Sequence, residues 1–425
     1  MTEGRQTRRG FLAATAGLAA VAGAGLAPRP ARALDDAPGA AAGATEPFWA
    51  THQGGIVTPA QAHTYIAAFD LTTDKRDELA GLLRRWTEAA AALSLGKPVD
   101  IPGEGDYAGE PDPADVLDLS PSRLTATFGF GIGLFEKDGR DRYGLRAQRP
   151  EAFVELPHFP GEQLAPARTG GDLFVQACAD NPQVAFHAVR QLARLAYGLA
   201  QIRWVQAGFV SDYGPSRTPR NLMGFKDGTG NPATGDAAAM DAVVWAGDEA
   251  PPWMRGGSYV VVRRARIALE HWDRMKVAFQ EQTFGRQKLS GAPLGGKSEF
   301  DPIDLAAADA DGNPIVPENS HVRLAHEAAL AGARVLRRSY SYNDGANVTA
   351  ERWPPWRQGM EFDAGLIFLC YQRDLRGGFI RIFEKMSRFD MMNQFVTNTG
   401  GGHFAVPRGA AEGEFIGQRL FEAGS

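Results

Sequence analysis

Two stretches of this 425-residue chain, far apart in sequence, share one order of elements. Residues 171–199 read as an apolar strand, a polar turn and an amphipathic helix, and residues 365–386 repeat that order. Each stretch carries a cysteine near the end of its strand, Cys178 in the first and Cys370 in the second. This weak internal duplication predicts two similar halves, and it limits the folds that are open to the rest of the chain.

The remaining pattern fits such a duplication. Further strands are predicted at 124–135 and 257–269, and a helix is predicted at 270–286. Strands and helices mix without the strict alternation of a parallel doubly wound sheet. We therefore expect an α+β fold in which each half is an antiparallel sheet backed by helices.

The first 33 residues have the features of an export signal. Arg8 and Arg9 stand just before "GFLAATAGLAAVAGAGLA", and "ARA" closes the stretch at Ala33. The Ala/Gly-rich run is short and weakly hydrophobic, so we expect cleavage rather than stable membrane insertion. "TRRGFL" resembles the twin-arginine pattern, which exports folded proteins that often hold a cofactor. We expect export through the twin-arginine machinery to the periplasm, the extracellular space or the cell envelope.

The domain plan follows from these segments. We expect a signal peptide over 1–33, a small-residue linker over 34–50, an N-terminal domain over 51–213 and a C-terminal domain over 214–425. The halves would meet in "SDYGPSRTPR".

Charge and cysteine content exclude some functions. The formal net charge is −5, and removal of residues 1–33, with five Arg and one Glu, would leave −9. Such an acidic chain, with no basic stripe, is not expected to bind nucleic acid. The two cysteines lie in apolar segments, which favours buried free thiols over a disulfide.

Several familiar motifs can be set aside. "GFGIG" at 129–133 has the glycine spacing of a closely packed strand rather than of a dinucleotide loop, and "DADGN" at 309–313 fits a turn better than a calcium loop. The sequence has neither zinc-ligand spacing nor a G-x-S-x-G elbow. Hydrolase and zinc-enzyme functions are therefore not favoured.

Three motifs remain, and together they resemble the dye-decolourising peroxidases. "GFKDGTGN" at 224–231 sets a carboxylate in a glycine-rich loop, "SHVRLAH" at 320–326 holds two of the eight histidines, and "LRRSYSYNDG" spans 336–345. The resemblance is to the exported subgroup that includes the periplasmic deferrochelatase/peroxidase. It extends over nearly the whole chain after residue 50, through segments such as "THQGGIVTPAQ" and "GRQKLSGAPLGG".

The resemblance implies a fold, a cofactor and a set of site residues. It implies two ferredoxin-like halves with one haem b per chain in the C-terminal half. By position in the family motifs, His321 would be the proximal iron ligand, Asp227 the distal acid–base residue and Arg338 the distal arginine that stabilises charge. Asp390 would hydrogen-bond the proximal histidine, with Asp374 as a competing candidate. The other residues expected against the haem are Gly228, Thr229, Gly230 and His326.

These roles are chemically sensible for reduction of hydrogen peroxide. A base must move a proton between the two peroxide oxygens, and an aspartate stays ionised in acid where a histidine would be protonated, so we expect an acidic optimum. An arginine would stabilise the departing hydroxide and keep the aspartate ionised. A carboxylate on the second ring nitrogen of His321 would lower the ferric/ferrous potential.

Several functions are compatible with these residues. The leading hypothesis is a peroxidase that oxidises dyes, phenols or similar small reductants. The alternatives are an iron-acquisition protein that releases haem iron or oxidises ferrous iron, and a non-enzymatic haem carrier. Homo-oligomers are possible. Side chains near Arg338 in sequence could relay electrons, although ordinary packing is the simpler role for each: Tyr340, Tyr342, Trp353 and Trp356.

Overall fold

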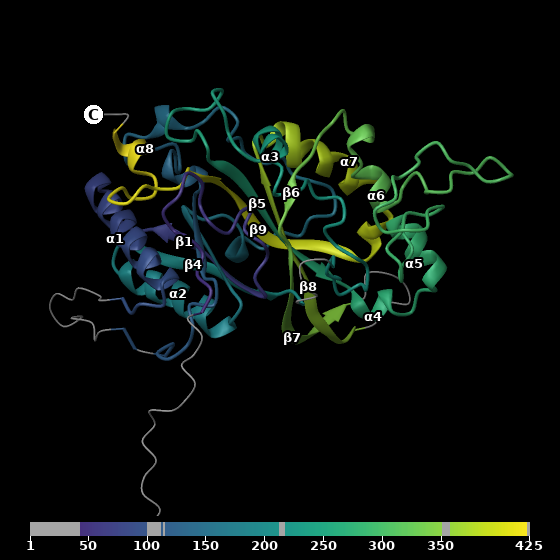
Figure 1. Ribbon diagram of the computed structural model, residues 1–425, viewed down its shortest axis with the longest axis horizontal. Helices are drawn as coiled ribbons and strands as arrows, with labels where there is room; N and C mark the ends of the chain where they lie inside the picture. The colour runs from purple at the N-terminus through teal and green to yellow at the C-terminus, as the bar shows by residue number, and fades with distance from the viewer. Residues whose placement is uncertain (1–42, 100–111, 114, 212–216, 351–357, 423–425) are drawn as a thin grey trace, which may run out of the picture. The chain divides into compact units, whose positions relative to one another are not determined.

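The first half of the chain folds as a βαββαβ unit in the computed structural model (Figure 1), which describes residues 43–99, 112, 113, 115–211, 217–350 and 358–422. Its strands pair antiparallel in the order β4-β1-β3-β2, which is the ferredoxin-like order. The elements are β1 (His63–Leu71), α1 (Arg76–Ser94), β2 (Thr125–Phe130), β3 (Leu173–Ala179), α2 (Pro182–Leu195) and β4 (Ala200–Phe209).

Side chains along each strand alternate between the two faces of this sheet, so each face contributes to a different cluster. On β1, Ala67 and Phe69 lie in the cluster that packs under α1 and α2, whereas Ile66 and Ala68 lie in a second cluster on the opposite face. Asn181 caps α2, because its side chain accepts a hydrogen bond of 2.8 Å from the Gln183 N–H. The sheet is therefore buried on both faces.

The second half repeats the same strand order. Here β9-β5-β8-β7 corresponds to β4-β1-β3-β2, again with antiparallel pairing. Cys178 in β3 and Cys370 in β8 occupy the third strand of each half, and both are buried free thiols. The expected duplication and the two ferredoxin-like halves are confirmed. The elements are α3 (Ala237–Val243), β5 (Ser258–Ile267), α4 (Leu269–Trp272), α5 (Val277–Phe284), α6 (His321–Leu324), β6 (Leu336–Arg337), β7 (Tyr340–Ala350), β8 (Gln358–Gln372), α7 (Arg381–Phe389), β9 (Val396–Val406) and α8 (Gln418–Glu422).

Short helical turns complete the second half near the site. A π-helical turn precedes α7, and 3₁₀ turns follow α6 and α7. Their bounds are η7 (Arg376–Ile380), η6 (Glu327–Ala329) and η8 (Met391–Gln394); in the first half, η3 (Ile132–Leu134), η4 (Arg146–Gln148) and η5 (Pro166–Arg168) have the same character.

Two of the expected elements differ in the structure. The predicted strand 124–135 ends at Phe130, because the chain turns into η3 where Gly131 lies against the Gly171 carbonyl, with no room for a Cβ. The predicted helix 270–286 is two short helices, α4 and α5. The side-chain amide of Gln280 donates to the carbonyls of Trp272 (3.0 Å) and Met275 (3.3 Å), which stabilises the break between them.

The edges of the two sheets meet and close the strands into a ring. Phe130 of β2 pairs with Ala405 of β9, and Phe209 of β4 pairs with Ser341 of β7. The interior is filled by side chains from both halves, and the rings of Phe174 and Phe404 stack there at 4.7 Å between centroids. The halves consequently share one core.

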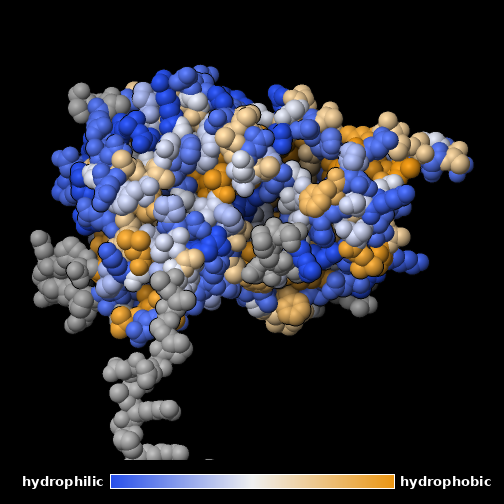
Figure 2. All heavy atoms as spheres, in the orientation of Figure 1, coloured by the Kyte–Doolittle hydropathy of each residue, from blue (hydrophilic) through white to orange (hydrophobic). Residues whose placement is uncertain are grey.

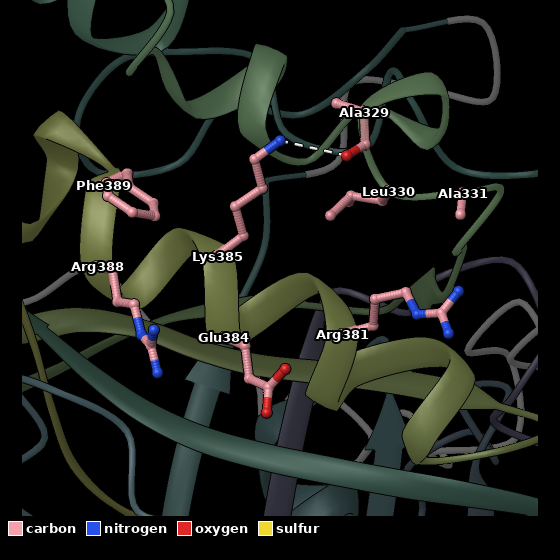
Figure 3. Close-up of a pocket in the computed structure, with 8 residues that line it drawn as sticks. All are labelled: Ala329, Leu330, Ala331, Arg381, Glu384, Lys385, Arg388 and Phe389. Atoms are coloured by element: carbon pink, nitrogen blue, oxygen red, sulfur yellow. Dashed lines mark hydrogen bonds between the residues drawn. The ribbon is translucent and has the colours of Figure 1, made fainter.

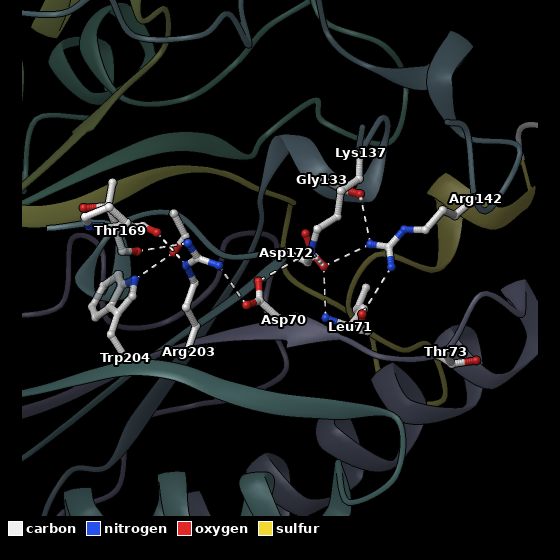
Figure 4. A network of polar contacts seen from close by, with 12 residues as sticks. Asp70, Leu71, Thr73, Gly133, Lys137, Arg142, Thr169, Asp172, Arg203 and Trp204 are labelled. Atoms are coloured by element: carbon white, nitrogen blue, oxygen red, sulfur yellow. Dashed lines mark hydrogen bonds and ion pairs between the residues drawn. The ribbon is translucent and has the colours of Figure 1, made fainter. Parts of the chain in front are cut away.

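A polar network supports the loops at one end of the first sheet (Figure 4). The buried carboxylate of Asp172 accepts hydrogen bonds of 2.9 Å from Lys137, Arg142 and the Leu71 N–H. Beside it, Arg203 binds the Asp70 carboxylate at 2.8 Å. Burial of Asp172 is tolerable because it is fully hydrogen-bonded.

Other expectations concern segments rather than the core. "DADGN" is a turn, as expected, because the Asp309 carboxylate accepts from the N–H groups of Asp311 and Asn313 at 2.9 Å each. The expected signal peptide lies outside the described residues, and so does part of the boundary segment, so the boundary at 213/214 stays a prediction.

Among the described helices, none has the length and apolar character needed to cross a membrane. Figure 2 shows one face of the molecule, mostly hydrophilic with separate hydrophobic patches.

Candidate active site

The glycine-rich loop 224–231 is shaped by two glycines and one aromatic anchor. Gly224 has φ +85° and Gly228 has φ +119°, conformations that side chains with a Cβ rarely adopt. Between them Phe225 is buried and stacks on Phe284 of α5, with centroids 3.9 Å apart and rings nearly parallel. The stacked ring of Phe225 fixes one side of the loop, and Asp227 follows Phe225 by two residues.

Glu299 clamps the loop from the other side. Its carboxylate pairs with the Lys226 ammonium and accepts a 3.0 Å hydrogen bond from the Thr229 hydroxyl. Burial raises the pKa of the Glu299 carboxyl, but hydrogen bonds from Lys226, Thr218 and Thr229 outweigh it, and the net pKa is lowered. The Glu299 carboxylate thus holds Lys226 and Thr229, the two residues that flank Asp227 and Gly228. The Thr229 hydroxyl makes its hydrogen bond to this carboxylate.

Asp227 faces Arg337. Its Oδ1 accepts a 2.8 Å hydrogen bond from Arg337 Nη1, and both side chains are partly buried. Asn231 fixes the same strand, because its amide donates to the Arg337 carbonyl (2.7 Å) and its Oδ1 accepts from the Arg337 N–H (3.1 Å). The loop and β6 are therefore joined both by backbone and by side-chain contacts.

The structure places Arg338, the expected distal arginine, away from Asp227. Arg338 is buried on the opposite side of the strand, where its guanidinium donates to the Thr58 carbonyl and to the Gln61 side chain. It makes no hydrogen bond or ion pair with Asp227 among the described residues. Successive side chains of an extended strand point to opposite faces, so Arg337 and Arg338 cannot both face the loop. Sequence reasoning missed Arg337, which the alternating "RRS" pattern places on the same face as Ser339.

His321 is the first residue of α6, and a carboxylate holds its side chain through Nδ1. Its Nδ1 lies 2.7 Å from Oδ2 of Asp390, a buried residue between α7 and η8. Asp390 is itself fixed, because its Oδ1 accepts a 2.8 Å hydrogen bond from the Met392 N–H. The competing candidate, Asp374, instead accepts from the Gly377 N–H at 2.6 Å. The structure thus brings Asp390, and not Asp374, to the histidine.

An aromatic cluster connects the two sides of the site. Phe284, stacked on Phe225 of the loop, also contacts His321, with 5.9 Å between ring centroids. Trp272 packs edge-on against Phe284 and donates to the Met223 carbonyl at 3.0 Å. The loop that carries Asp227 and the helix that carries His321 therefore rest on one buried cluster.

The residues present fit a haem between these two elements. The Nε2 atom of His321 has no described hydrogen-bond partner, whereas Nδ1 is bound, which is the usual arrangement of an imidazole that ligates a metal. A Cβ on Gly230 would meet nothing within 4 Å, and one on Gly228 nothing within 3.5 Å, so the loop has open space beside it. The Ser339 hydroxyl is buried without a partner in the described part of the chain.

The remaining candidates lie further from this arrangement. His326 caps η6, since its Nδ1 accepts a 3.2 Å hydrogen bond from the Ala328 N–H, and it has no described contact with Asp227. Tyr340 and Tyr342 are buried in the core that the halves share, where the Tyr340 hydroxyl contacts the Cys178 thiol at 3.5 Å. Trp353 and Trp356 lie outside the described residues.

Comparison with known proteins identifies the family of the chain. The model of the N-terminal Dyp-type peroxidase domain matches residues 53–210, and the model of the C-terminal domain matches residues 218–411. A dye-decolorizing peroxidase of Thermobifida fusca is 38% identical, over 98% of this chain and 97% of that protein. A deferrochelatase of Escherichia coli K12 is 34% identical over 88% of this chain and 87% of that protein. The structure of ferric DtpA from Streptomyces lividans is 41% identical, covers 90% of this chain and 98% of that chain, and superposes with a TM-score of 0.80.

The chain belongs to the Dyp-type peroxidase family. It is a haem peroxidase, an oxidoreductase whose two ferredoxin-like halves and haem cofactor are those expected from the sequence.

Proposed function

We propose that this protein reduces hydrogen peroxide at the site between the 224–231 loop and α6, with dyes, phenols or similar small molecules as electron donors. The observation that carries the proposal is the facing pair Asp227 and Arg337, set across one aromatic cluster from the pair His321 and Asp390. The Nε2 atom of His321 would hold one haem b per chain. The haem iron supplies the redox chemistry that splits the oxygen–oxygen bond.

Asp227 would move the proton. One carboxylate oxygen is held by Arg337, and the other has no described partner, so it is free to accept a proton from one peroxide oxygen and return it to the other. Arg337, which is always charged, would hold the Asp227 carboxylate in place between turnovers. The same guanidinium would stabilise the hydroxide that leaves. We therefore propose Arg337 for the role that the resemblance implied for Arg338.

On the opposite side, Asp390 would position the ring of His321. A carboxylate that accepts from Nδ1–H fixes the tautomer and leaves Nε2 as the ligand atom. A carrier of haem would need this half of the site only, so the distal pair is what favours catalysis. The expected acidic optimum follows from an aspartate rather than a histidine as base, and Glu299 supports it by holding the loop with a carboxyl whose pKa is lowered.

The test compares Asp227→Asn with Asp374→Asn. We expect Asp227→Asn to keep its haem content but to react with hydrogen peroxide about 10²- to 10⁴-fold more slowly at acidic pH, measured by stopped-flow at the Soret band. The matched control removes a carboxylate that caps a turn elsewhere, and it should react at the wild-type rate. An unchanged rate in Asp227→Asn would reject the proposed base.

A second candidate function is release of iron from haem, because relatives that are 34% identical carry the name deferrochelatase. This second function predicts that iron-free porphyrin forms when the holoprotein is incubated with a reductant. Porphyrin fluorescence measures this directly, and peroxide-dependent dye oxidation without porphyrin release would reject it.

We further propose export by the twin-arginine route. The support is the pair Arg8 and Arg9 before an Ala/Gly-rich run that ends in "ARA". Replacing both arginines with lysine should retain the precursor in the cytoplasm, as shown by fractionation and the size of the protein. Export of this variant at the normal rate would exclude the route.

A further inference from the structure

We propose that the cavity between α7 and the turn after η6 binds the anionic aromatic reductants of this peroxidase, on the side of the protein where His321 is held. The inference rests on the proposed peroxidase function for its biological meaning, but the binding itself can be measured without peroxide. The cavity has a volume of about 470 Å³, within the range of small-molecule sites. Its lining, drawn in Figure 3, consists of Ala329, Leu330, Ala331, Arg381, Glu384, Lys385, Arg388 and Phe389.

The charge of the cavity selects an anion. Arg381, Lys385 and Arg388 lie at spacings of four and three residues along α7, so they follow one side of the helix. Within the described part of the chain none of the three forms an ion pair, and Glu384 is the only carboxylate in the lining. Glu327, in the adjacent η6, is paired with Arg334 at 3.2 Å and does not neutralise the cluster.

The shape and apolar content select an aromatic molecule. Phe389 ends α7 with 60% of its surface exposed, beside the cavity, and can stack on a flat ring. Opposite it, Leu330 is buried and forms an apolar wall with the two alanines. Figure 3 shows Lys385 extending from α7 towards the turn, where its ammonium donates to the Ala329 carbonyl at 3.2 Å. Figure 3 shows Arg381 and Arg388 at the two ends of this side of α7, so each would offer its charge at a different end of the cavity.

The wall opposite α7 is preformed. The Gly332 N–H donates to the Glu327 carbonyl at 2.9 Å, and the Ala333 N–H donates to the Leu330 carbonyl at 3.2 Å. Ala331 has φ +52°, an uncommon value for a residue with a Cβ, and it lies in the wall itself. The turn thus keeps its form without a ligand, which lowers the cost of binding.

The cavity adjoins the residue that supports His321. Phe389 directly precedes Asp390, whose carboxylate lies 2.7 Å from His321 Nδ1. A reductant beside Phe389 is therefore close to the hydrogen bond that supports the ligand of the haem. Two reductant molecules in succession would each lose one electron, and these two electrons with two protons convert one hydrogen peroxide to two waters.

The test separates binding from turnover. Binding of a disulfonated anthraquinone dye to the holoprotein is measured by equilibrium dialysis in the absence of peroxide, for wild type, Arg381→Gln/Arg388→Gln and Phe389→Ala. We expect the double variant to bind about tenfold more weakly and the Phe389→Ala variant to lose part of the affinity at every salt concentration. Arg376→Gln is the matched control, because Arg376 is exposed in η7 but does not line the cavity.

Steady-state kinetics provides the second readout. The KM for the sulfonated dye should rise about tenfold in the double variant, while the KM for a neutral phenol and the rate of reaction with peroxide stay at wild-type values. Equal dye binding by wild type, the double variant and Phe389→Ala would overturn the proposed site. Charge-dependent dye binding by a protein that fails to react with peroxide would instead overturn the proposed function and leave the site standing.

Discussion

At the scale of single residues, the neighbours Arg337 and Arg338 serve different parts of the molecule. Arg337 faces Asp227 and Asn231 on the glycine-rich loop. Arg338 is buried and donates to the Thr58 carbonyl and the Gln61 side chain of the first half. One arginine therefore faces the site for which we propose the chemistry, and the other lies in the contact between the halves.

Substitution of each arginine should separate these roles. We expect Arg337→Gln to react with peroxide about 10²-fold more slowly while its thermal midpoint changes little, because it removes a charge that stabilises the leaving group. Arg338→Gln should lower the free energy of unfolding by about 2–4 kcal/mol, because it strands buried acceptors, and should keep most of the peroxide reactivity. Stopped-flow and thermal unfolding measure the two effects. The opposite pattern would restore Arg338 as the distal arginine.

The sequence alone could not distinguish these two arginines. Adjacent positions of a strand face opposite sides, and a shift of one residue in register exchanges their faces. Asp227 is the one aspartate of its motif, whereas "SHVRLAH" offers both His321 and His326. The choice between Asp390 and Asp374 as the partner of His321 needed the fold. Glu299 carries no local signal, since it clamps the loop from far along the chain.

A largely buried histidine in β9, His403, makes stability depend on pH. Burial is the main reason that the pKa of His403 is lowered from its usual value of 6.5 to about 3, with nearby Arg263 acting in the same direction. Its Nε2 has no hydrogen-bond partner among the described residues. Below pH 6.5, His403 binds a proton in the unfolded chain but not in the folded chain. The free energy of unfolding therefore falls as the pH is lowered towards 3.

Replacement of this histidine should therefore reduce sensitivity to acid. Between pH 6.5 and 4.5 we expect wild type to lose about 2–3 kcal/mol more of its free energy of unfolding than His403→Asn does. Urea unfolding at the two pH values measures the difference, and His158→Asn, at an exposed position, serves as control. Parallel losses in wild type and His403→Asn would show that His403 does not titrate in this window.

At the scale of elements, the glycine-rich loop offers two glycines with different requirements. Gly228 has φ +119°, whereas Gly230 has an ordinary φ and open space around its missing Cβ. A side chain at Gly228 strains the backbone whatever the space, while a side chain at Gly230 would extend into the space that we assign to haem. The two positions thus distinguish backbone strain from exclusion of the cofactor.

Alanine at each position should give opposite results. We expect Gly228→Ala to destabilise the protein without haem by about 1–2 kcal/mol, because a residue with a Cβ must adopt a disfavoured φ. Gly230→Ala should leave the stability of the haem-free protein unchanged but weaken haem binding. Thermal unfolding of the haem-free forms and haem titration test both effects, and loss of stability in Gly230→Ala would contradict the open space beside the loop.

Other elements show where periodicity suffices and where it does not. Strand β5 and the duplicated strand–turn–helix units follow directly from apolar patterning. The expected helix over 270–286 is divided into α4 and α5, and the side chain of Gln280, within α5, stabilises the break by donating to the carbonyls of Trp272 and Met275. The apolar periodicity of the segment does not show which backbone carbonyls a polar side chain within it will bind.

At the scale of the whole molecule, the two halves share a core although each has its own sheet. The interior of the strand ring takes side chains from both halves, and the contact of Phe174 in β3 with Phe404 in β9 crosses between them. In the described chain the strands of the two sheets pair through one residue pair at each edge, and backbone hydrogen bonds from Gln163, Ala165 and Gly170 to β9 also join the halves. Cohesion of the halves therefore depends on the shared core together with these contacts, and the described chain from residue 43 should unfold as one unit.

This cooperativity can be tested from the half that lacks the site. Phe174→Ala removes a fully buried ring and should cost about 3–5 kcal/mol. If the halves are coupled, the far-UV signal of all the helices and strands and the Soret signal of the haem site must shift together to lower denaturant concentration. Phe300→Ala, which removes the same side chain at a position with 70% exposure, should shift neither. A Soret transition that stays in place while part of the far-UV signal is lost would show that the second half, with its site, holds its structure without the first.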